Sequence, residues 1–326
     1  MKPGFLKKAA GPFQHLFWKM QLDILRACPP LSGLVFEFSQ GALASRRVWG
    51  RTLLRAAAQA PRAVADDWRN KRENLTVLSI VGVPVTTRCT LCCDKCLSHM
   101  PDVKEHKDVP LDEMTQQLRA LFSCADHICV VILSGGEAFL HPDLDEIIGL
   151  CATSGKVGKI YVPANGTVIP DARVLAALRD ANATVQISKY PTALQPKVEA
   201  LKLVLRENEI DFTHNSGLTS WYDTAAPGQR QEGQAKRRFD VCTQQLYLIY
   251  TNGNLHLCSK SAALMEEGFI SDTAEDYIDM RAVCPAAFPG QLRALLKKRA
   301  VLACSYCMGY TYETARVPVA AQRKGD

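Results

Sequence analysis

The chain has 326 residues, of which 47% are hydrophobic and 22% charged, and its formal net charge is +6. This composition indicates a globular protein long enough to bury a full core, and it argues against a disordered or fibrous chain. The basic residues are dispersed along the chain, so the charge does not indicate a nucleic-acid partner. No apolar stretch approaches about 18 residues, so we predict no membrane-spanning helix.

The first domain that we expect is a helical extension over residues 1–75. Apolar residues recur there at near-helical spacing, which favours a cap packed on the main domain over a helix that contacts a membrane surface. Pro29 and Pro30 are expected to end this helix, and residues 51–72 to form a second, alanine-rich one. The apolar positions of the first helix are Phe13, Leu16, Phe17, Met20 and Ile24.

Strands that alternate with helices are predicted over residues 76–215, and from the second strand on the units recur every 24 to 31 residues. This rhythm is typical of a parallel sheet with helices outside it, and right-handed crossovers curl such a sheet toward a barrel. We therefore expect an α/β fold, a partial (β/α)6 TIM-type barrel. The expected strands are residues 77–85, 128–133, 159–162, 184–188 and 210–213.

The last third of the chain predicts a linker over 216–240 and a small domain over 241–326. Within that domain, Asn252-Gly253 lies between two apolar runs, which favours a β-hairpin with a type I′ turn. A helix is expected over 289–302. Tyr222, Asp223, Arg237 and Arg238 belong to the linker, and they could contact a substrate or simply form a solvated charged segment.

Thirteen cysteines are a high, odd number, and they are clustered rather than evenly spaced. This pattern differs from the disulfide framework of a small secreted domain. Lys7 and Lys8 are similar to the start of a secretory signal, but polar residues and Pro12 interrupt any apolar run that follows. We therefore expect a cytoplasmic protein with reduced thiols.

Cys89, Cys93 and Cys96 form a C-x3-C-x2-C cluster just after the first predicted strand. Three thiolates hold three irons of a [4Fe–4S] cube and leave the fourth iron open to a small molecule. Active sites of parallel α/β folds form at this end of the strands. The alternative is a zinc site, although Cys92 is poorly placed beside Cys93 to complete it.

Three further motifs follow later predicted strands. Ser134-Gly135-Gly136-Glu137 ends the second, Asn165-Gly166 follows the third, and Ser188-Lys189 ends the fourth. Turn formation and strand capping would explain the last two equally well.

A second set of thiols consists of Cys242, Cys258, Cys304 and Cys307, and Gly253 completes a C-x10-G-x4-C pattern. Four thiols can enclose a second [4Fe–4S] cluster completely, and a structural zinc is the alternative. Cys284 is either an additional ligand or, as we favour, a buried thiol. The remaining cysteines are predicted to lie in the core: Cys28, Cys124, Cys129 and Cys151.

Together these motifs resemble the radical S-adenosylmethionine superfamily. Thr87–Cys96 is similar to its cluster loop and Ser134–Glu137 to its GGE motif. The resemblance implies that the open iron chelates the methionine moiety of S-adenosylmethionine. The residues that it implies in cosubstrate binding are Ser134, Gly135, Gly136, Glu137, Asn165 and Ser188. Lys95 departs from the pattern, because an aromatic residue usually precedes the third cysteine.

The second thiol set resembles the twitch extension, a shortened SPASM domain. This resemblance implies hydrogen abstraction by a 5′-deoxyadenosyl radical and oxidation of an alcohol of a sugar- or cyclitol-like metabolite, with the second cluster as electron acceptor. Lys189 or His214 is the expected base, and a flavodoxin or ferredoxin the expected one-electron donor. A redox-neutral reaction, in which the second cluster only shapes the substrate pocket, is equally compatible with the sequence. Two further alternatives are the epimerisation or crosslinking of a ribosomally made peptide, and a non-catalytic, zinc-stabilised binding module.

Overall fold

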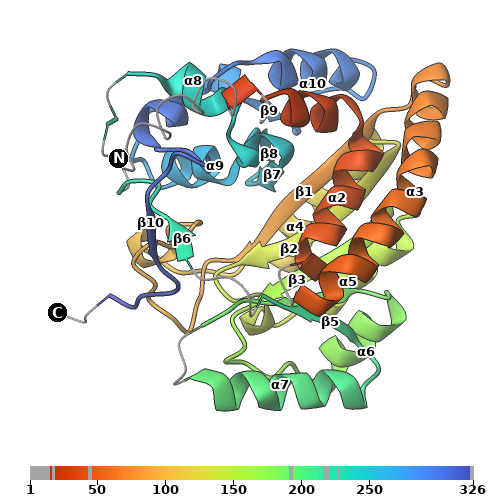
Figure 1. The fold of residues 1–326 in the computed structure, drawn as a ribbon, viewed down its shortest axis with the longest axis vertical. Coiled ribbons are helices and arrows are strands. Elements are labelled where there is room, and N and C mark those ends of the chain that lie inside the picture. Colours follow the sequence, from red (N-terminus) through yellow and green to blue (C-terminus); the bar gives the residue numbers. More distant parts are fainter. Residues whose placement is uncertain are drawn as a thin grey trace, which may run out of the picture.

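The computed structural model describes residues 15–323, apart from 17–18, 43–45, 191–193, 216–219, 227, 229 and 232. Its centre is an open sheet in the order β5-β4-β3-β2-β1-β7-β8-β9 (Figure 1). The strands are β1 (Val77–Thr86), β2 (His127–Gly135), β3 (Val157–Ala164), β4 (Thr184–Ile187), β5 (Asp211–His214), β7 (Leu248–Thr251), β8 (Asn254–His256) and β9 (Tyr277–Asp279). β1 to β5 pair in parallel, so the predicted partial barrel is confirmed, and β5 and β9 leave it open.

Helices that alternate with these strands bury one face of the sheet. Val83 and Val85 of β1 are fully buried among Leu118 and Ile148 of those helices. The helices are α4 (Leu111–Cys124), α5 (Leu144–Thr153), α6 (Ala172–Asp180) and α7 (Gln195–Glu207). Branched apolar residues favour strands in the pleated sheet, and they supply most of this core.

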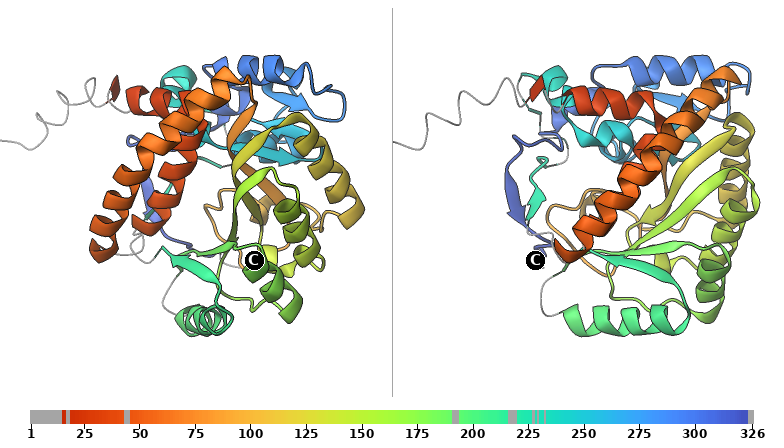
Figure 2. Two further views of the ribbon diagram at one scale, coloured as in Figure 1. Left: turned by 90° about the vertical axis from the view of Figure 1, so that its right-hand side faces the viewer. Right: turned by 45° about the vertical axis from the view of Figure 1, so that its right-hand side comes forward.

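Two further helices, α2 (Pro29–Ala42) and α3 (Arg46–Arg72), lie on the side of the sheet away from α4 and α5 (Figure 2). The helix α2 packs against β1 and β2, and α3 packs on α2. Phe36 of α2 meets the ring of Tyr161 edge-on, 5.2 Å between centroids. The first helix ends at Ala27, just before the two prolines, as predicted, but the new helix that starts there was not predicted. Proline suits the first turn of a helix, because its missing N–H has no partner there, and α2 begins at Pro29.

The first helix does not pack through its predicted apolar face. Leu16, Met20 and Ile24 are more than half exposed, whereas Leu22 is buried. Phe13 and Phe17 lie outside the described residues. None of the helices in the described part of the chain combines the length and apolar character that a membrane crossing requires.

The predicted linker contains secondary structure. β6 (Ser220–Tyr222) pairs antiparallel with β10 (Arg316–Pro318) in a separate two-stranded sheet, and α8 (Ala235–Asp240) follows β6. The partner strand lies almost a hundred residues further along the chain, so local sequence could not indicate the pairing.

The hairpin β7–β8 forms at the predicted turn, where Asn252 and Gly253 have φ of 47° and 75°. Its first strand pairs in parallel with β1, Leu248 opposite Val81, so the hairpin continues the barrel sheet. Two helices complete this part of the chain, α9 (Ser259–Glu266), which was not predicted, and α10 (Phe288–Lys297).

Candidate iron–sulfur sites

The first candidate site is the loop after β1, and each of its three predicted ligand thiols faces N–H donors. Asn165 Nδ2 lies 3.8 Å from Cys89 Sγ, and Gln322 Nε2 lies 3.1 Å from Cys93 Sγ. Three backbone N–H groups just downstream are directed at the thiol of Cys96. N–H donors around sulfur are the surroundings expected of thiolates that bind iron–sulfur clusters.

The same three thiols are buried or half-buried and interact electrostatically with one another. The pKa of Cys93 is raised to about 11, chiefly by burial, and the neighbouring thiols Cys96 and Cys89 contribute to that shift. Burial likewise raises the pKa of Cys89, and Cys96 adds to that shift. The three sulfurs therefore converge, and a cationic cluster core would offset their mutual repulsion as thiolates.

Two glycines let the end of β2 approach this loop. A Cβ on Gly135, which has φ of 144°, would lie 2.0 Å from the carbonyl oxygen of Thr86, and one on Gly136 would lie 2.2 Å from that of Arg88. The backbones are joined instead by hydrogen bonds, from Gly136 N to Thr86 O (2.9 Å) and from Glu137 N to Arg88 O (2.8 Å). The glycine pair therefore fastens the cysteine loop to the neighbouring strand.

The carboxylate of Glu137 is 1% exposed and joins the ends of β2 and β3. It accepts hydrogen bonds from Asn165 N (2.7 Å) and Phe139 N (3.3 Å), and burial raises its pKa to about 7. The side chain of Asn165 in turn donates to Thr90 Oγ1 at 2.9 Å and accepts from Thr167 N at 2.9 Å. Both residues therefore shape the loop, while their predicted contact with the cosubstrate stays a prediction.

The other predicted residues lie at the same end of the sheet. Ser134 is near the end of β2, and Ser188 follows β4, where its N–H donates to Ala164 O at 2.9 Å. His214 ends β5, its Nε2 is buried without a partner, and its pKa is lowered chiefly by burial. The charge of Lys189 contributes to that shift, which shows that the two predicted bases are near each other.

Tyr190 is a residue of this region that sequence reasoning missed. Burial raises the pKa of its phenol, and the thiols of Cys93, Cys89 and Cys96 contribute, so the phenol faces the cysteine loop. Its ring meets Trp221 of β6 edge-on, with centroids 6.3 Å apart. Its place directly after Ser188-Lys189 was the only sequence signal.

The second candidate site is a cavity lined by all four thiols of the second predicted set, Cys242, Cys258, Cys304 and Cys307. Burial raises the pKa of Cys242 to about 11 and that of Cys304 to about 12. Three of the sulfurs accept backbone N–H groups, from Tyr310 to Cys242 (3.4 Å), Ser261 to Cys258 (3.4 Å) and Gly309 to Cys307 (3.2 Å). The donor set fits a fully ligated [4Fe–4S] cluster.

Cys284 does not line this cavity, and it is exposed, so the prediction that it is a buried thiol is wrong. It lies near Cys124, which is part of the core. Among the described residues, no three His, Cys, Asp or Glu side chains are arranged for a single metal ion. A cube of four irons is larger than one ion, and its thiols are spaced more widely.

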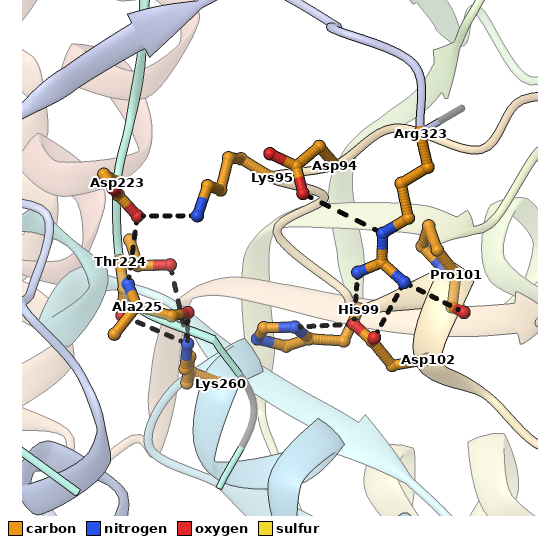
Figure 3. A network of polar contacts seen from close by, with 10 residues as sticks. All are labelled: Asp94, Lys95, His99, Pro101, Asp102, Asp223, Thr224, Ala225, Lys260 and Arg323. Atoms are coloured by element: carbon orange, nitrogen blue, oxygen red, sulfur yellow. Dashed lines mark hydrogen bonds and ion pairs between the residues drawn. The ribbon is translucent and has the colours of Figure 1, made fainter. Parts of the chain in front are cut away.

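A polar network lies between the two sites (Figure 3). Lys95, which stands where the aromatic residue was expected, forms an ion pair with Asp223 at 3.1 Å. The ring of His99 is 5% exposed, its Nδ1 lies 3.4 Å from Asp102 Oδ2, and burial lowers its pKa to about 4. Arg237 of the linker pairs with Glu313 at 2.9 Å, so it has a structural partner.

The C-terminal segment crosses the cysteine loop, which the sequence did not predict. Gln322 forms a β-bridge with Cys93, and its Oε1 accepts from Cys92 N at 2.9 Å. Arg323 pairs with Asp102 at 2.9 Å. These contacts join residues more than 200 positions apart and hold the loop from its outer side.

Among the solved structures similar to this chain is anSMEcpe with bound AdoMet and Cp18Cys peptide, 18% identical over 42% of each chain, with a TM-score of 0.35. Streptococcus suis SuiB bound to S-adenosylmethionine is 15% identical over 48% of this chain and 36% of its own, with a TM-score of 0.33. BtrN in complex with AdoMet and 2-DOIA is 16% identical over 71% of this chain and 92% of its own, with a TM-score of 0.41.

Each of these three structures contains bound S-adenosylmethionine. The chain matches less than half the length of anSMEcpe and of SuiB. No protein-family model matches the sequence, and no curated protein matches it.

Proposed function

We propose that this chain is a radical S-adenosylmethionine enzyme that takes a hydrogen atom from a small polar metabolite and oxidises one of its alcohols. The observation that supports it most is the convergence of Cys89, Cys93 and Cys96 at the carboxyl end of β1, each facing N–H donors. A [4Fe–4S] cluster held there supplies, with S-adenosylmethionine, a 5′-deoxyadenosyl radical.

The residues of the chain would position the reactants and move a proton. The glycine pair of β2 and the side chain of Asn165 hold the cysteine loop in place. Oxidation of an alcohol to a carbonyl releases one hydrogen atom to the deoxyadenosyl radical, then one proton and one electron. The imidazole of His214 suits the proton, because its lowered pKa leaves it neutral and its Nε2 has no partner.

The remaining electron needs an acceptor. That acceptor would be a fully ligated [4Fe–4S] cluster, held in the cavity that Cys242, Cys258, Cys304 and Cys307 line. An external one-electron donor of the flavodoxin or ferredoxin class would start each cycle.

Anaerobic reconstitution tests the proposal. We expect about eight irons per chain and cleavage of S-adenosylmethionine under reducing conditions. Cys93→Ala should abolish cleavage, whereas Cys304→Ala should leave cleavage that is uncoupled from substrate oxidation. Equal loss in two well-folded variants would refute the separate roles. A colourless protein with stoichiometric zinc would instead indicate a zinc-stabilised module.

A further inference from the structure

Lys260 is a buried cation in α9, two residues after Cys258, and it is 2% exposed. Its ammonium donates to Ala225 O (3.0 Å) and Thr224 O (3.2 Å), with Thr224 Oγ1 at 3.5 Å (Figure 3). Three acceptors match the three N–H donors of an ammonium. The side chain is therefore held in one place.

This position lies between the two cysteine sites. Lys260 lines the cavity of the second site together with the four thiols. Burial lowers the pKa of its ammonium group, and the nearby thiols of Cys307 and Cys258 oppose that shift. On its other side it lowers the pKa of His99, whose backbone N–H is directed at the thiol of Cys96. The ammonium group of Lys260 is therefore a positive charge beside the second cysteine site, on the side that faces the first cysteine site.

The carboxylates nearest to Lys260 have other cationic partners. Asp223 pairs with Lys95 at 3.1 Å, and Asp102 pairs with Arg323 at 2.9 Å. Each partner offsets the carboxylate that would otherwise neutralise Lys260. Lys260 is 2% exposed, so solvent screens the interaction of its ammonium group with the thiols only weakly.

We propose that Lys260 raises the reduction potential of a cluster held by Cys242, Cys258, Cys304 and Cys307 and so makes that cluster the electron acceptor. The inference rests on the proposed function, because it needs the second cluster. A thiolate-bound cluster becomes more negative when it takes up an electron, and a nearby cation stabilises the reduced form. Net charge and hydrogen bonding around the cluster set its potential.

The experiment compares charge-removing with charge-keeping variants of the full chain. In a background that carries Cys89→Ala, Cys93→Ala and Cys96→Ala, only the second site binds iron. Lys260→Met and Lys260→Gln remove the charge, Lys260→Arg keeps it, and Lys197→Met removes an exposed charge on α7. Each protein is reconstituted anaerobically, checked by circular dichroism and iron analysis, and titrated potentiometrically with detection by electron paramagnetic resonance.

We expect a lower midpoint potential for Lys260→Met and Lys260→Gln, and a potential near the parent value for Lys260→Arg and Lys197→Met. Equal potentials in all of these proteins would overturn the inference. The inference would also be overturned if Lys260→Met and Lys260→Gln took up no iron while Lys260→Arg did. Lys260 would then serve only to hold the segment at residues 224–225 in place. If the background protein itself binds no cluster, the auxiliary-cluster part of the proposed function fails as well, whereas cleavage by the wild-type chain would still test the first site.

Discussion

Gly136→Ala tests whether the glycine pair of β2 fastens the cysteine loop. The new Cβ would lie 2.2 Å from the backbone oxygen of Arg88, whereas an ordinary contact needs at least 3.4 Å, so the two segments must separate by about 1.2 Å. Overpacking of this kind costs about 1–3 kcal/mol. The separation also breaks the 2.8 Å hydrogen bond from Glu137 N to Arg88 O, which adds about 1 kcal/mol.

Gly149→Ala is the matched control, because its Cβ would meet nothing within 4 Å. It lies inside α5, where alanine is favoured over glycine by about 1 kcal/mol. Urea unfolding of the iron-free proteins should therefore show Gly136→Ala destabilised by about 2–4 kcal/mol and Gly149→Ala slightly stabilised. Gly136→Ala should also take up about four fewer irons on reconstitution. Unchanged stability and iron content in Gly136→Ala would refute the reasoning.

Two other variants test neighbouring features of the first site. Burial raises the folded-state pKa of Glu137 from 4.5 to about 7, so the protein binds a proton more tightly when folded, and the stability due to this group is complete below about pH 4.5 and lost as the pH rises through about 7. Glu137→Gln should flatten that part of the profile of urea midpoints against pH, and parallel profiles would contradict the assignment. Gln322→Leu removes the donor 3.1 Å from Cys93 Sγ, so a chelator should remove iron from the first site faster than from wild type, and an unchanged rate would contradict a role for the C-terminal segment.

Residues that act through local chemistry could be placed from the sequence. The strand before Cys89 is predicted because branched apolar residues occupy six of the nine positions from Val77 to Val85. The hairpin at Asn252-Gly253 is predicted because that turn needs positive φ at both positions, which the structure shows. Periodicity and turn chemistry depend on residues that are neighbours in the chain, so both can be predicted without knowledge of the fold.

Spacing also indicated which thiols belong together. The four thiols from Cys242 to Cys307 line one cavity, although 45 residues separate Cys258 from Cys304. Cys284 shows the limit of such reasoning, because its exposure depends on how the segment after β9 packs.

Tertiary structure alone decided what surrounds the thiols. Lys260 gave no signal in the sequence, and it matters because α9 brings it against Thr224 from a distant segment. Gln322 reaches Cys93 only because β10 pairs with β6 and leads the chain end across the loop. The sequence by itself determined the parallel strands, the turn and the candidate sulfur ligands, since these follow from local pattern. The charges and donors that would tune the two clusters come from residues far apart along the chain, and only the folded packing brings them together.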